Sequence, residues 1–594
     1  MAGHFFFIVG PSGAGKDSLI SGVQPWLTPS RFVFARRVIT REAMADAEDH
    51  DSCSESHFLE RQKNGEFLIT WQAHGLFYGL PASLLDDIER GVNVIANGSR
   101  NMIEALQRTV PSLRVIEVTA PTHVLRARLK ARNRESAQDI DQRLQRASLA
   151  MPPGITCQRV MNDLSLEIGI SRLKAALLRE LPETQESERL LFRKICGETL
   201  AQSAYKSLLA EIMHGDFSLH DVQAFLVACT QNLQEEEIIA IAQARTALYP
   251  RIQWAHPMVV DKHSMGGLPG SRVTMVVVPI VAAYGLLIPK TSSRAITSAA
   301  GTADAMEVLA RVDLDFEEVK QCVQATNGCI AWNGKLNHSI LDDALNPLVR
   351  PMGLDTRSWS VASILSKKFT AGATHVVIDI PHCGNGKVKT AQEATELGLL
   401  FERVGTALGL VVKAFATDGN APIGRGIGPA LEARDVLQVL DNHPDAPTDL
   451  LNKALFFAGH ILALDDEVGN LDEGLRLAHE LVQSGAARQR LDAIIAAQGA
   501  MAESKETVHQ LAVRSTRTGT IRGIQGSHIS SIARAAGAPG IPQAGIDLKK
   551  LVGETVTEGE VLYLIQSTQS ESLGLAHEQA SKHHGYDIAA EGLT

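Results

Sequence analysis

The sequence has few cysteines and no cysteine pattern that would build a disulfide framework or a structural zinc site. Its 7 cysteines are an odd number, they are scattered along the chain, and no Cys-x-x-Cys occurs. We therefore expect reduced thiols, as in a cytoplasmic protein.

Long apolar runs are missing as well. The longest mostly apolar stretch, residues 274–288, is shorter than the roughly 20 residues of a membrane-spanning helix and contains Pro279. The N-terminal "MAGHFFFIVG" has no basic region before its short apolar run, so we expect neither a signal peptide nor a membrane partner.

There is no excess of positive charge, no tandem repeat and no low-complexity tract. The net charge is −10, which argues against nucleic acid as a partner but leaves room for local basic pockets that bind small phosphorylated molecules. Hydrophobic residues make up 45% and charged residues 21% of the chain, as in ordinary globular proteins. At roughly 150 residues per domain, 594 residues suggest about four domains.

The order of apolar and polar stretches predicts an α/β protein with several parts. "HFFFIVG", "VNVIANG" and "LRVIEVTA" alternate with polar helical stretches, which is typical of a parallel sheet covered by helices. The charged residues 179–190 indicate either a linker or the start of a helix. The predicted parts are an α/β domain at 1–182, a linker at 183–194, a helical domain at 195–257 completed by later helices, a large α/β domain at 258–504, a small β-rich domain at 505–570 and a polar tail at 571–594.

A glycine-rich loop follows the first predicted strand. Gly10-x-x-x-x-Gly15-Lys16 stands between an apolar strand and a likely helix, which is the context of a P-loop. Its backbone N–H groups and the helix N-terminus would hold phosphate oxygens, and Lys16 would bridge the β- and γ-phosphates of ATP. The predicted ATP-binding residues are Gly10, Pro11, Ser12, Gly13, Ala14, Gly15, Lys16, Asp17 and Ser18.

Two features near this loop have two interpretations each. Asp17 stands where a hydroxyl residue usually binds Mg²⁺; its carboxylate is either a Mg²⁺ ligand or an acidic residue favoured by the helix dipole. The arginine-rich residues 128–147 are either a solvated basic face or, behind a P-loop, a segment whose Arg132 and Arg134 clamp the transferred phosphoryl group.

A second stretch rich in glycine and hydroxyl residues appears after residue 260. "DKHSMGGLPGSRVT" is followed by "TSSRAITSAAGTAD", where small residues permit close backbone approach and hydroxyls can donate to an oxyanion. Lys262 and Arg294 would add positive charge. The residues alone allow either an anion site or two polar loops beside a buried segment.

Residues 1–182 resemble ribose 1,5-bisphosphate phosphokinase, a relative of guanylate kinase. The matching motifs are "GPSGAGKDS", "RRVITR", "TWQAHGLFYG", "NGSR", the arginine-rich segment and "MND". The resemblance implies transfer of a phosphoryl group from ATP, with Mg²⁺, to ribose 1,5-bisphosphate, giving 5-phosphoribosyl 1-diphosphate. It makes Arg36, Arg37 and Arg41 weaker candidates for holding the acceptor's phosphates.

Residues from about 195 to 570 resemble the nucleoside phosphorylases that include thymidine phosphorylase, and match the AMP phosphorylase branch most closely. The matching motifs are "DKHS-x-GG-x-PG", "PKTSSRAITS-x-AGTAD-x-MEVL", "ASILSKK", "THVVIDIP" and "DGNAPIGRGIGPALEARDVL". The resemblance implies that phosphate cleaves a nucleoside 5′-monophosphate, AMP favoured, to base and ribose 1,5-bisphosphate. Members of this family are usually homodimers or larger, so a homo-oligomer is expected.

The same resemblance suggests which residues act. Asp355 would protonate the departing base and would need a raised pKa; the residues alone make it a turn carboxylate. The residues predicted to bind phosphate and nucleotide are Lys262, Ser264, Gly267, Ser293, Arg294, Ala295, Ile296, Thr297, Ser298, Thr302, Ser363, Lys367 and Lys387.

The product implied for the C-terminal part is the substrate implied for the N-terminal part, so the chain is predicted to be a bifunctional enzyme. Two alternatives remain: a thymidine or pyrimidine nucleoside phosphorylase joined to a guanylate-kinase-like module, or a P-loop half that binds nucleotide without turnover. His583 and His584, near the end of the chain, suggest either a metal site or, more simply, part of a frayed polar tail.

Overall fold

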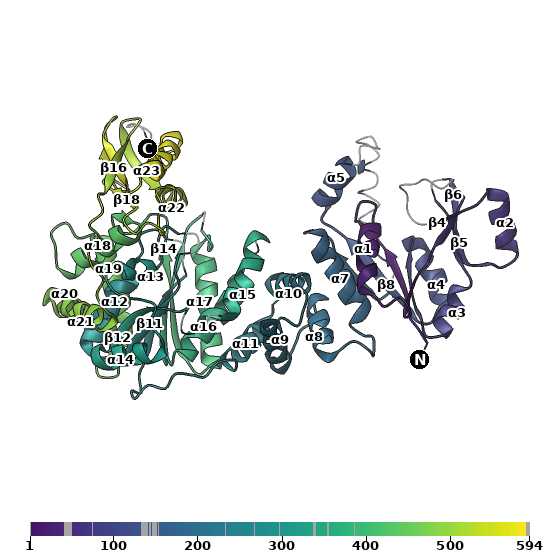
Figure 1. Ribbon diagram of the computed structural model, residues 1–594, viewed down its shortest axis with the longest axis horizontal. Coiled ribbons are helices and arrows are strands. Elements are labelled where there is room, and N and C mark those ends of the chain that lie inside the picture. The colour runs from purple at the N-terminus through teal and green to yellow at the C-terminus, as the bar shows by residue number, and fades with distance from the viewer. Residues whose placement is uncertain are drawn as a thin grey trace. The chain divides into compact units, whose positions relative to one another are not determined.

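The computed structural model shows two compact units (Figure 1). Unit 1 comprises Met1–Glu237 and Leu345–Thr356, and unit 2 comprises Ile238–Ala344 and Arg357–Thr594. None of the described helices combines the length and the apolar composition that a membrane crossing requires. The structure describes residues 2–40, 50–73, 75–131, 140–141, 144, 151, 154–231, 233–265, 268–295, 298–334, 336, 340–352, 354, 356–384 and 386–589.

Unit 1 begins with a five-stranded parallel sheet in the order β2-β7-β1-β8-β9. The strands are β1 (Phe5–Val9), β2 (Phe32–Phe34), β7 (Asn93–Asn97), β8 (Leu113–Thr119) and β9 (Cys157–Met161). Every residue of β1 is buried, because the sheet lies between helices. The helices are α1 (Lys16–Val23), η1 (Gln24–Trp26), α3 (Leu84–Glu89), η2 (Arg100–Met102), α4 (Ile103–Thr109), α5 (Thr122–Ala131) and α7 (Leu166–Leu178). The predicted parallel α/β fold is confirmed.

A second, four-stranded sheet in unit 1 has the order β4-β3-β6-β5. Its elements are β3 (Arg37–Ile39), β4 (His50–Ser52), helix α2 (Glu55–Lys63), β5 (Phe67–Ala73) and β6 (Leu76–Pro81). Aromatic side chains hold it together: Phe58 stacks on Phe67 with ring centroids 4.7 Å apart, and Trp71 stacks on Tyr78 at 5.3 Å.

Of the two interpretations of the charged region, the structure shows the start of a helix, and most of the segment 183–194 that was assigned to a linker is helical. Unit 1 continues with α8 (Glu186–Ile195), α9 (Gln202–His214) and α10 (Leu219–Gln231). The charge of this region suggested solvent exposure, but Lys194 lies fully buried and its Nζ is 2.7 Å from Glu237 Oε1. Burying both charges together avoids the large cost of burying either one alone.

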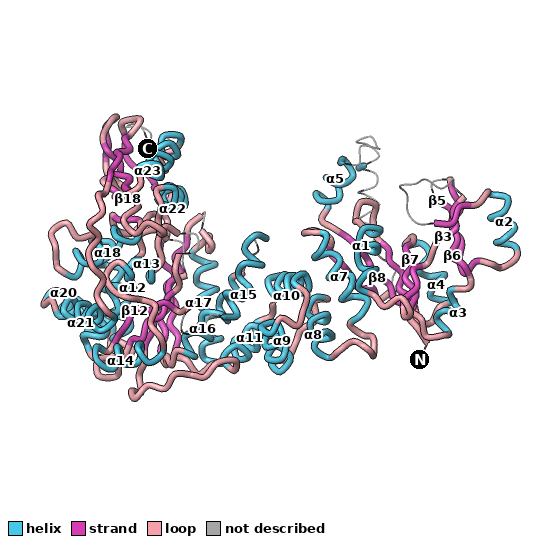
Figure 2. The backbone as a smooth tube through the Cα atoms, in the orientation of Figure 1, coloured by secondary structure: helices cyan, strands magenta, loops and turns pink. Residues whose placement is uncertain are grey.

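Two parallel sheets form the centre of unit 2, shown as magenta strands in Figure 2. One has the order β10-β13-β14, with β10 (Val260–Ser264), β13 (His375–His382) and β14 (Val411–Asp418). The other pairs β11 (Ile288–Ser292) with β12 (Gly328–Trp332). The helices from 235 to 407 are α11 (Glu235–Thr246), α12 (Val273–Tyr284), α13 (Thr302–Glu307), α14 (Phe316–Thr326), α15 (Ile340–Val349), η3 (Arg350–Met352), α16 (Arg357–Thr370) and α17 (Ala391–Ala407). Of these residues, 235–237 and 345–352 belong to unit 1.

Helix α12 lies in the main hydrophobic core of unit 2. Its residues from Val273 to Ala282 are buried, and it packs against α19, α20 and α21. An apolar helix of this kind is expected inside a large domain. The helices that surround this core are α18 (Pro429–Leu440), α19 (Thr448–Leu462), α20 (Leu471–Gln483) and α21 (Ala486–Gln498).

The C-terminal part contains two small antiparallel sheets, β15-β18-β20-β16 and β19-β17-β21, which confirms the predicted small β-rich region. Their strands are β15 (Gly426–Ile427), β16 (His509–Arg514), β17 (Gly519–Ile524), β18 (Gly545–Leu548), β19 (Thr555–Val556), β20 (Val561–Ser567) and β21 (Tyr586–Ala589). Two helices, α22 (Gly526–Ala535) and α23 (Ser570–Lys582), pack on each other.

The predicted polar tail at 571–594 also differs from the structure. Most of it forms α23 and β21, and the apolar side chains Leu573, Ala576 and Ile588 are buried in the C-terminal core. His583 and His584 each accept a backbone N–H through Nδ1, from Gly585 at 3.2 Å and from Tyr586 at 3.1 Å. Among the described residues, no cluster of His, Cys, Asp or Glu has the composition of a metal site.

Candidate active sites

The P-loop lies between β1 and α1 in unit 1. Gly13 and Gly15 both have a φ of 84°, which glycine adopts without the strain that a side chain would cause. Lys16 Nζ donates to the backbone carbonyls of Gly10 and Pro11, at 2.9 and 3.1 Å. The lysine therefore lies folded along the loop that would surround the phosphates.

Two asparagines that sequence reasoning did not assign hold the P-loop. Asn97, the last residue of β7, donates to Asp17 Oδ1. Asn162, just after β9, donates to the carbonyl of Ala14 at 2.8 Å. Both stand at the carboxyl ends of strands in a parallel sheet, where α/β proteins place their ligand sites.

Arg128 of α5 is a further unassigned residue beside the P-loop. A Cβ atom built on Gly15 would lie 4.0 Å from its Nη1. This nitrogen is buried and makes no hydrogen bond within the described part of the chain. A buried guanidinium nitrogen that faces a phosphate loop is placed to donate to a phosphoryl oxygen.

The other predicted residues of unit 1 are less informative. Arg36 forms an exposed ion pair with Asp51 at 3.3 Å, and Arg37 lies in β3. Arg41, Arg132 and Arg134 lie outside the described residues.

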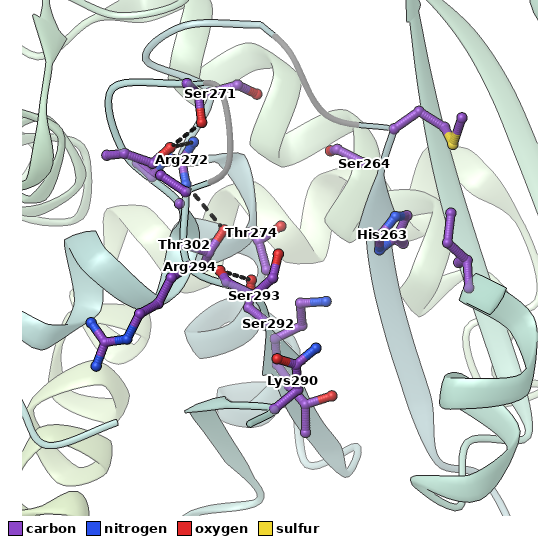
Figure 3. Close-up of a pocket in the computed structure, with 18 of the residues that line it drawn as sticks. His263, Ser264, Ser271, Arg272, Thr274, Lys290, Ser292, Ser293, Arg294 and Thr302 are labelled. Carbon is purple, nitrogen blue, oxygen red and sulfur yellow. Dashed lines mark hydrogen bonds between the residues drawn. The ribbon is translucent and has the colours of Figure 1, made fainter. Parts of the chain in front are cut away.

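In unit 2 a cavity of about 220 Å³ brings together many of the predicted residues. Its walls come from the ends of β10 and β11, the start of α12, the loop before α13, and α16. In Figure 3, His263 and Ser264 approach from one side, whereas Ser271, Arg272, Ser293 and Thr302 gather on the other. Of the predicted residues, Ser264, Ser293, Arg294, Ala295, Ser298, Thr302, Lys367 and Lys387 line the cavity.

The cavity is basic. The basic residues that line it are His263, Arg272, Lys290, Arg294, Lys367, Lys368 and Lys387, and none of its described lining residues is acidic. Hydroxyl groups of serines and threonines complete the lining. Cationic groups together with neutral donors are the surroundings that phosphoryl oxygens prefer, so the cavity is suited to an anion.

One wall of the cavity is built on helix α12. Ser271, Arg272 and Thr274 stand at the start of this helix, where the helix dipole favours an anion. Arg272 Nη1 donates to Thr302 Oγ1 at 3.2 Å and its Nε pairs with buried Glu432. The guanidinium therefore connects the helix start with the following hydroxyl-rich loop.

Asp304 shapes that loop. Its Oδ2 accepts the backbone N–H of Ala295 at 2.6 Å and that of Gly301 at 2.7 Å. Arg294 Nη2 pairs with Glu307 at 2.7 Å, and Figure 3 shows its guanidinium pointing away from the centre of the pocket. Arg294 therefore supports the loop, whereas its own charge is balanced by neighbouring carboxylates.

Two of the residues predicted to bind phosphate or nucleotide, Lys262 and Ser363, do not line the cavity. Lys262 is fully buried, lies 3.7 Å from Asp379 Oδ2, and has its pKa lowered to about 8 by burial. Ser363 donates to Asp342 Oδ2 at 2.6 Å. Gly267, Ile296, Thr297 and Asp355 lie outside the described residues.

His263 was missed by the sequence analysis although it stands in the quoted motif "DKHS". Burial, together with nearby Lys368 and Lys290, lowers the pKa of its imidazole well below the ordinary value. The ring is therefore neutral at pH 7, and it can donate or accept a hydrogen bond without adding charge to the cavity.

Comparisons with known proteins show the family of the chain. Residues 256–488 match the family model described as glycosyl transferase family, a/b domain. A bifunctional ribose 1,5-bisphosphokinase–thymidine phosphorylase of Cupriavidus pinatubonensis is 51% identical over 97% of this chain and 96% of its own length. Proteins of the same name from Cupriavidus necator and Azorhizobium caulinodans are 52% and 46% identical, over 97% and 100% of this chain and 96% and 98% of their own lengths.

The chain belongs to this family of bifunctional kinase–phosphorylases. It is an enzyme that joins a phosphotransferase to a pentosyltransferase, as the resemblances predicted. The two chemistries imply ATP and phosphate as co-substrates. Among solved structures, anthranilate phosphoribosyltransferase from Thermus thermophilus covers 52% of this chain at 20% identity with a TM-score of 0.43, and is covered over 99% of its own length.

Proposed function

We propose that the chain converts a nucleoside 5′-monophosphate, phosphate and ATP into base, 5-phosphoribosyl 1-diphosphate and ADP in two steps. Unit 2 would cleave the nucleotide to ribose 1,5-bisphosphate, and unit 1 would phosphorylate that product. The observation that carries the proposal is the basic cavity of unit 2, which has no acidic residue among its described lining. Nucleotide phosphorolysis requires two phosphoryl groups in one site, and therefore more positive charge than nucleoside phosphorolysis.

In the first step, an oxygen of inorganic phosphate attacks C1 of the ribose while the bond from C1 to the base breaks. The start of α12, Arg272 and the loop held by Asp304 supply donors to phosphoryl oxygens. Negative charge develops on the departing base, and Asp355 would protonate it, as the family resemblance suggests. Fixed donors and a placed acid both lower the barrier because they stabilise charge that appears in the transition state.

In the second step, unit 1 transfers the γ-phosphoryl group of ATP to the 1-phosphate of ribose 1,5-bisphosphate. The P-loop N–H groups, Lys16 and Arg128 would stabilise the phosphoryl charge. The carboxylate of Asp17, which accepts a hydrogen bond from Asn97, would serve as a Mg²⁺ ligand. A Mg²⁺ site in a protein typically uses one or two carboxylates. When bound there, Mg²⁺ would neutralise charge on the phosphates.

A second candidate for unit 2 is phosphorolysis of thymidine or another pyrimidine nucleoside. It is supported by the names of the relatives, which include thymidine phosphorylase. It would require only inorganic phosphate as the anion. For either activity, we also propose a cytoplasmic homo-oligomer.

A substrate panel tests the proposal. Purified protein is incubated with phosphate, Mg²⁺ and one of AMP, CMP, UMP or thymidine, with and without ATP, and products are identified by mass spectrometry. We expect base and ribose 1,5-bisphosphate from a nucleotide without ATP, and 5-phosphoribosyl 1-diphosphate when ATP is added. Release of base from thymidine alone would contradict the nucleotide assignment in favour of the second candidate.

A further inference from the structure

Within the described residues of unit 2, three buried carboxylates near the cavity are each shared by two cationic side chains. They are Asp261 with Lys290 and Lys368, Asp342 with Arg245 and Lys367, and Asp379 with Lys262 and Lys453. The nitrogen-to-oxygen distances run from 2.7 Å for Lys367–Asp342 to 3.7 Å for Lys262–Asp379. Each group contains two cationic side chains and one carboxylate. When both cationic side chains are protonated, the group therefore carries a net charge of about +1.

An excess of buried positive charge is costly unless an anion balances it. Of the three groups, only Asp261 has both of its cationic partners, Lys290 and Lys368, among the residues that line the cavity. Lys290 Nζ lies 3.3 Å from Asp261 Oδ1, and Lys368 Nζ lies 2.8 Å from Asp261 Oδ2. All three side chains are at most 5% exposed, so solvent screens their charges poorly.

We propose that Lys290, Asp261 and Lys368 form a phosphoryl-binding subsite of the cavity, in which Lys290 donates directly to a phosphoryl oxygen. Asp261 holds both lysines in place, and the bound dianion supplies the negative charge that one carboxylate cannot. The ligand is inorganic phosphate or the phosphoryl group of a sugar phosphate. Its identity rests on the proposed function, whereas the subsite itself rests on the geometry.

The subsite should take up a proton when it is filled. Burial and the neighbouring Lys368 lower the pKa of Lys290, against the opposing effect of Asp261. A lowered pKa means that the amine loses its proton near neutral pH in the free enzyme, and an arriving dianion restores it. The titratable groups that interact with Lys290 are Asp261 and His263 of β10, Lys368 of α16 and Cys329 of β12, and Lys367 of α16 acts in turn on His263. Binding should therefore weaken as the pH rises above neutral.

Calorimetric titration of the full chain tests the subsite. Inorganic phosphate and ribose 5-phosphate are titrated separately at pH 8, in two buffers with different enthalpies of protonation. We expect Lys290→Met to weaken binding of at least one ligand about 10- to 100-fold, the effect of losing a charged hydrogen bond, and to abolish the proton uptake. The ligand that is weakened identifies the source of the phosphoryl group.

Lys453→Met is the matched control. It also removes one of two lysines from a shared buried carboxylate, Asp379, but Lys453 does not line the cavity. We expect a change below about threefold for this variant. Circular dichroism checks that both variants fold; Lys290→Met leaves Asp261 paired with Lys368.

Unchanged affinity for both ligands in folded Lys290→Met, with the proton uptake retained, would overturn the subsite. An equal loss of affinity in Lys453→Met would also overturn it, because the loss in Lys290→Met would then follow from the change in net charge alone. The proposed function fails separately, through the absence of base release from nucleotides by the unaltered protein. The two tests therefore separate two outcomes. In one, the enzyme acts on nucleotides but lacks this subsite; in the other, the subsite exists but the enzyme has another specificity.

Discussion

The proposed P-loop site of unit 1 would offer its ligand mainly backbone N–H groups, whereas the cavity of unit 2 is lined by lysine, arginine and hydroxyl side chains. The P-loop is one contiguous run, residues 10–18, and its lysine rests on two carbonyls of the same loop. The cavity draws its walls from β10, β11, α12 and α16, which span more than a hundred residues of sequence.

This difference sets how each region responds to change. A site built from backbone N–H groups depends on the geometry of the loop. Because few of its side chains carry charge, we expect its activity to depend strongly on one lysine. A side-chain site shares its charge among several groups, so each substitution costs less and the supporting carboxylates matter as much as the cations.

The largest effect should come from Lys16→Ala. Losing the single charged donor of the P-loop should lower kinase turnover about 100- to 1,000-fold, and phosphorolysis should stay unchanged because it uses unit 2. Separate assays of ATP consumption and of base release measure the two activities. Lys63→Ala, on the exposed face of α2, is the control with no expected loss; equal loss in both variants would remove Lys16 from the site.

A smaller effect is expected from Asp304→Ala. The change removes the acceptor for two backbone N–H groups of the loop, and should lower kcat/KM of phosphorolysis about 10- to 100-fold through a weaker phosphate affinity. Steady-state kinetics at varied phosphate concentration measures it. Asp313→Ala, which alters an exposed ion pair with Arg311, serves as control. A loss of base release with unchanged phosphate dependence would contradict the role of Asp304.

Glycine geometry in unit 1 can be tested by a matched pair, Gly15→Ala and Gly65→Ala. Both positions have positive φ, 84° and 73°, so each variant should lose about 1–2 kcal/mol of unfolding free energy. A Cβ at Gly15 would lie 2.5 Å from Asn162 Nδ2, whereas nothing lies within 4 Å at Gly65. Only Gly15→Ala should therefore lower kinase activity, about tenfold, from displacement of Asn162. Equal activity in the two variants would show that this contact does not shape the P-loop.

The smallest effect should come from Asn97→Ala. It removes one exposed hydrogen bond to Asp17, worth about 0.5–1.5 kcal/mol, and should raise the KM for Mg²⁺–ATP about 2- to 10-fold. Kinase assays at varied Mg²⁺ measure it. A fall in kcat with unchanged KM would mean that Asn97 acts on the transition state and not on nucleotide binding.

Local patterns in the sequence predicted most of the fold. The strands β1, β7 and β8 were expected from their apolar runs, and the C-terminal strands from their glycine-separated segments. Helix α8 was expected only as one of two interpretations, and the ordered end of the chain was not expected, because charged residues such as Lys194 look solvated until their buried partner is known. Burial of an ion pair depends on tertiary contacts that no local window contains.

The candidate sites divide in the same way. The P-loop could be predicted from the spacing of its residues alone. Asn97 and Asn162 could not be assigned to it, because they lie beside the loop only when the order of the strands in the sheet is known. In unit 2, Lys290 and Lys368 stand within the motifs quoted above, yet only the fold shows that both pair with Asp261 of β10. Lys262 was expected at the phosphate because of its motif, but its strand directs it toward Asp379. Direction of a side chain from a strand cannot be fixed before the register is known.

The central claim is that the two phosphate sites act in succession on one ribose. The most direct test supplies inorganic phosphate labelled with ¹⁸O, together with a nucleoside 5′-monophosphate and unlabelled ATP, and locates the label in the product by tandem mass spectrometry. The account predicts 5-phosphoribosyl 1-diphosphate with the label in the phosphoryl group next to C1 and none in the terminal one, which comes from ATP. Unlabelled 5-phosphoribosyl 1-diphosphate, or label in the terminal phosphoryl group, would contradict it.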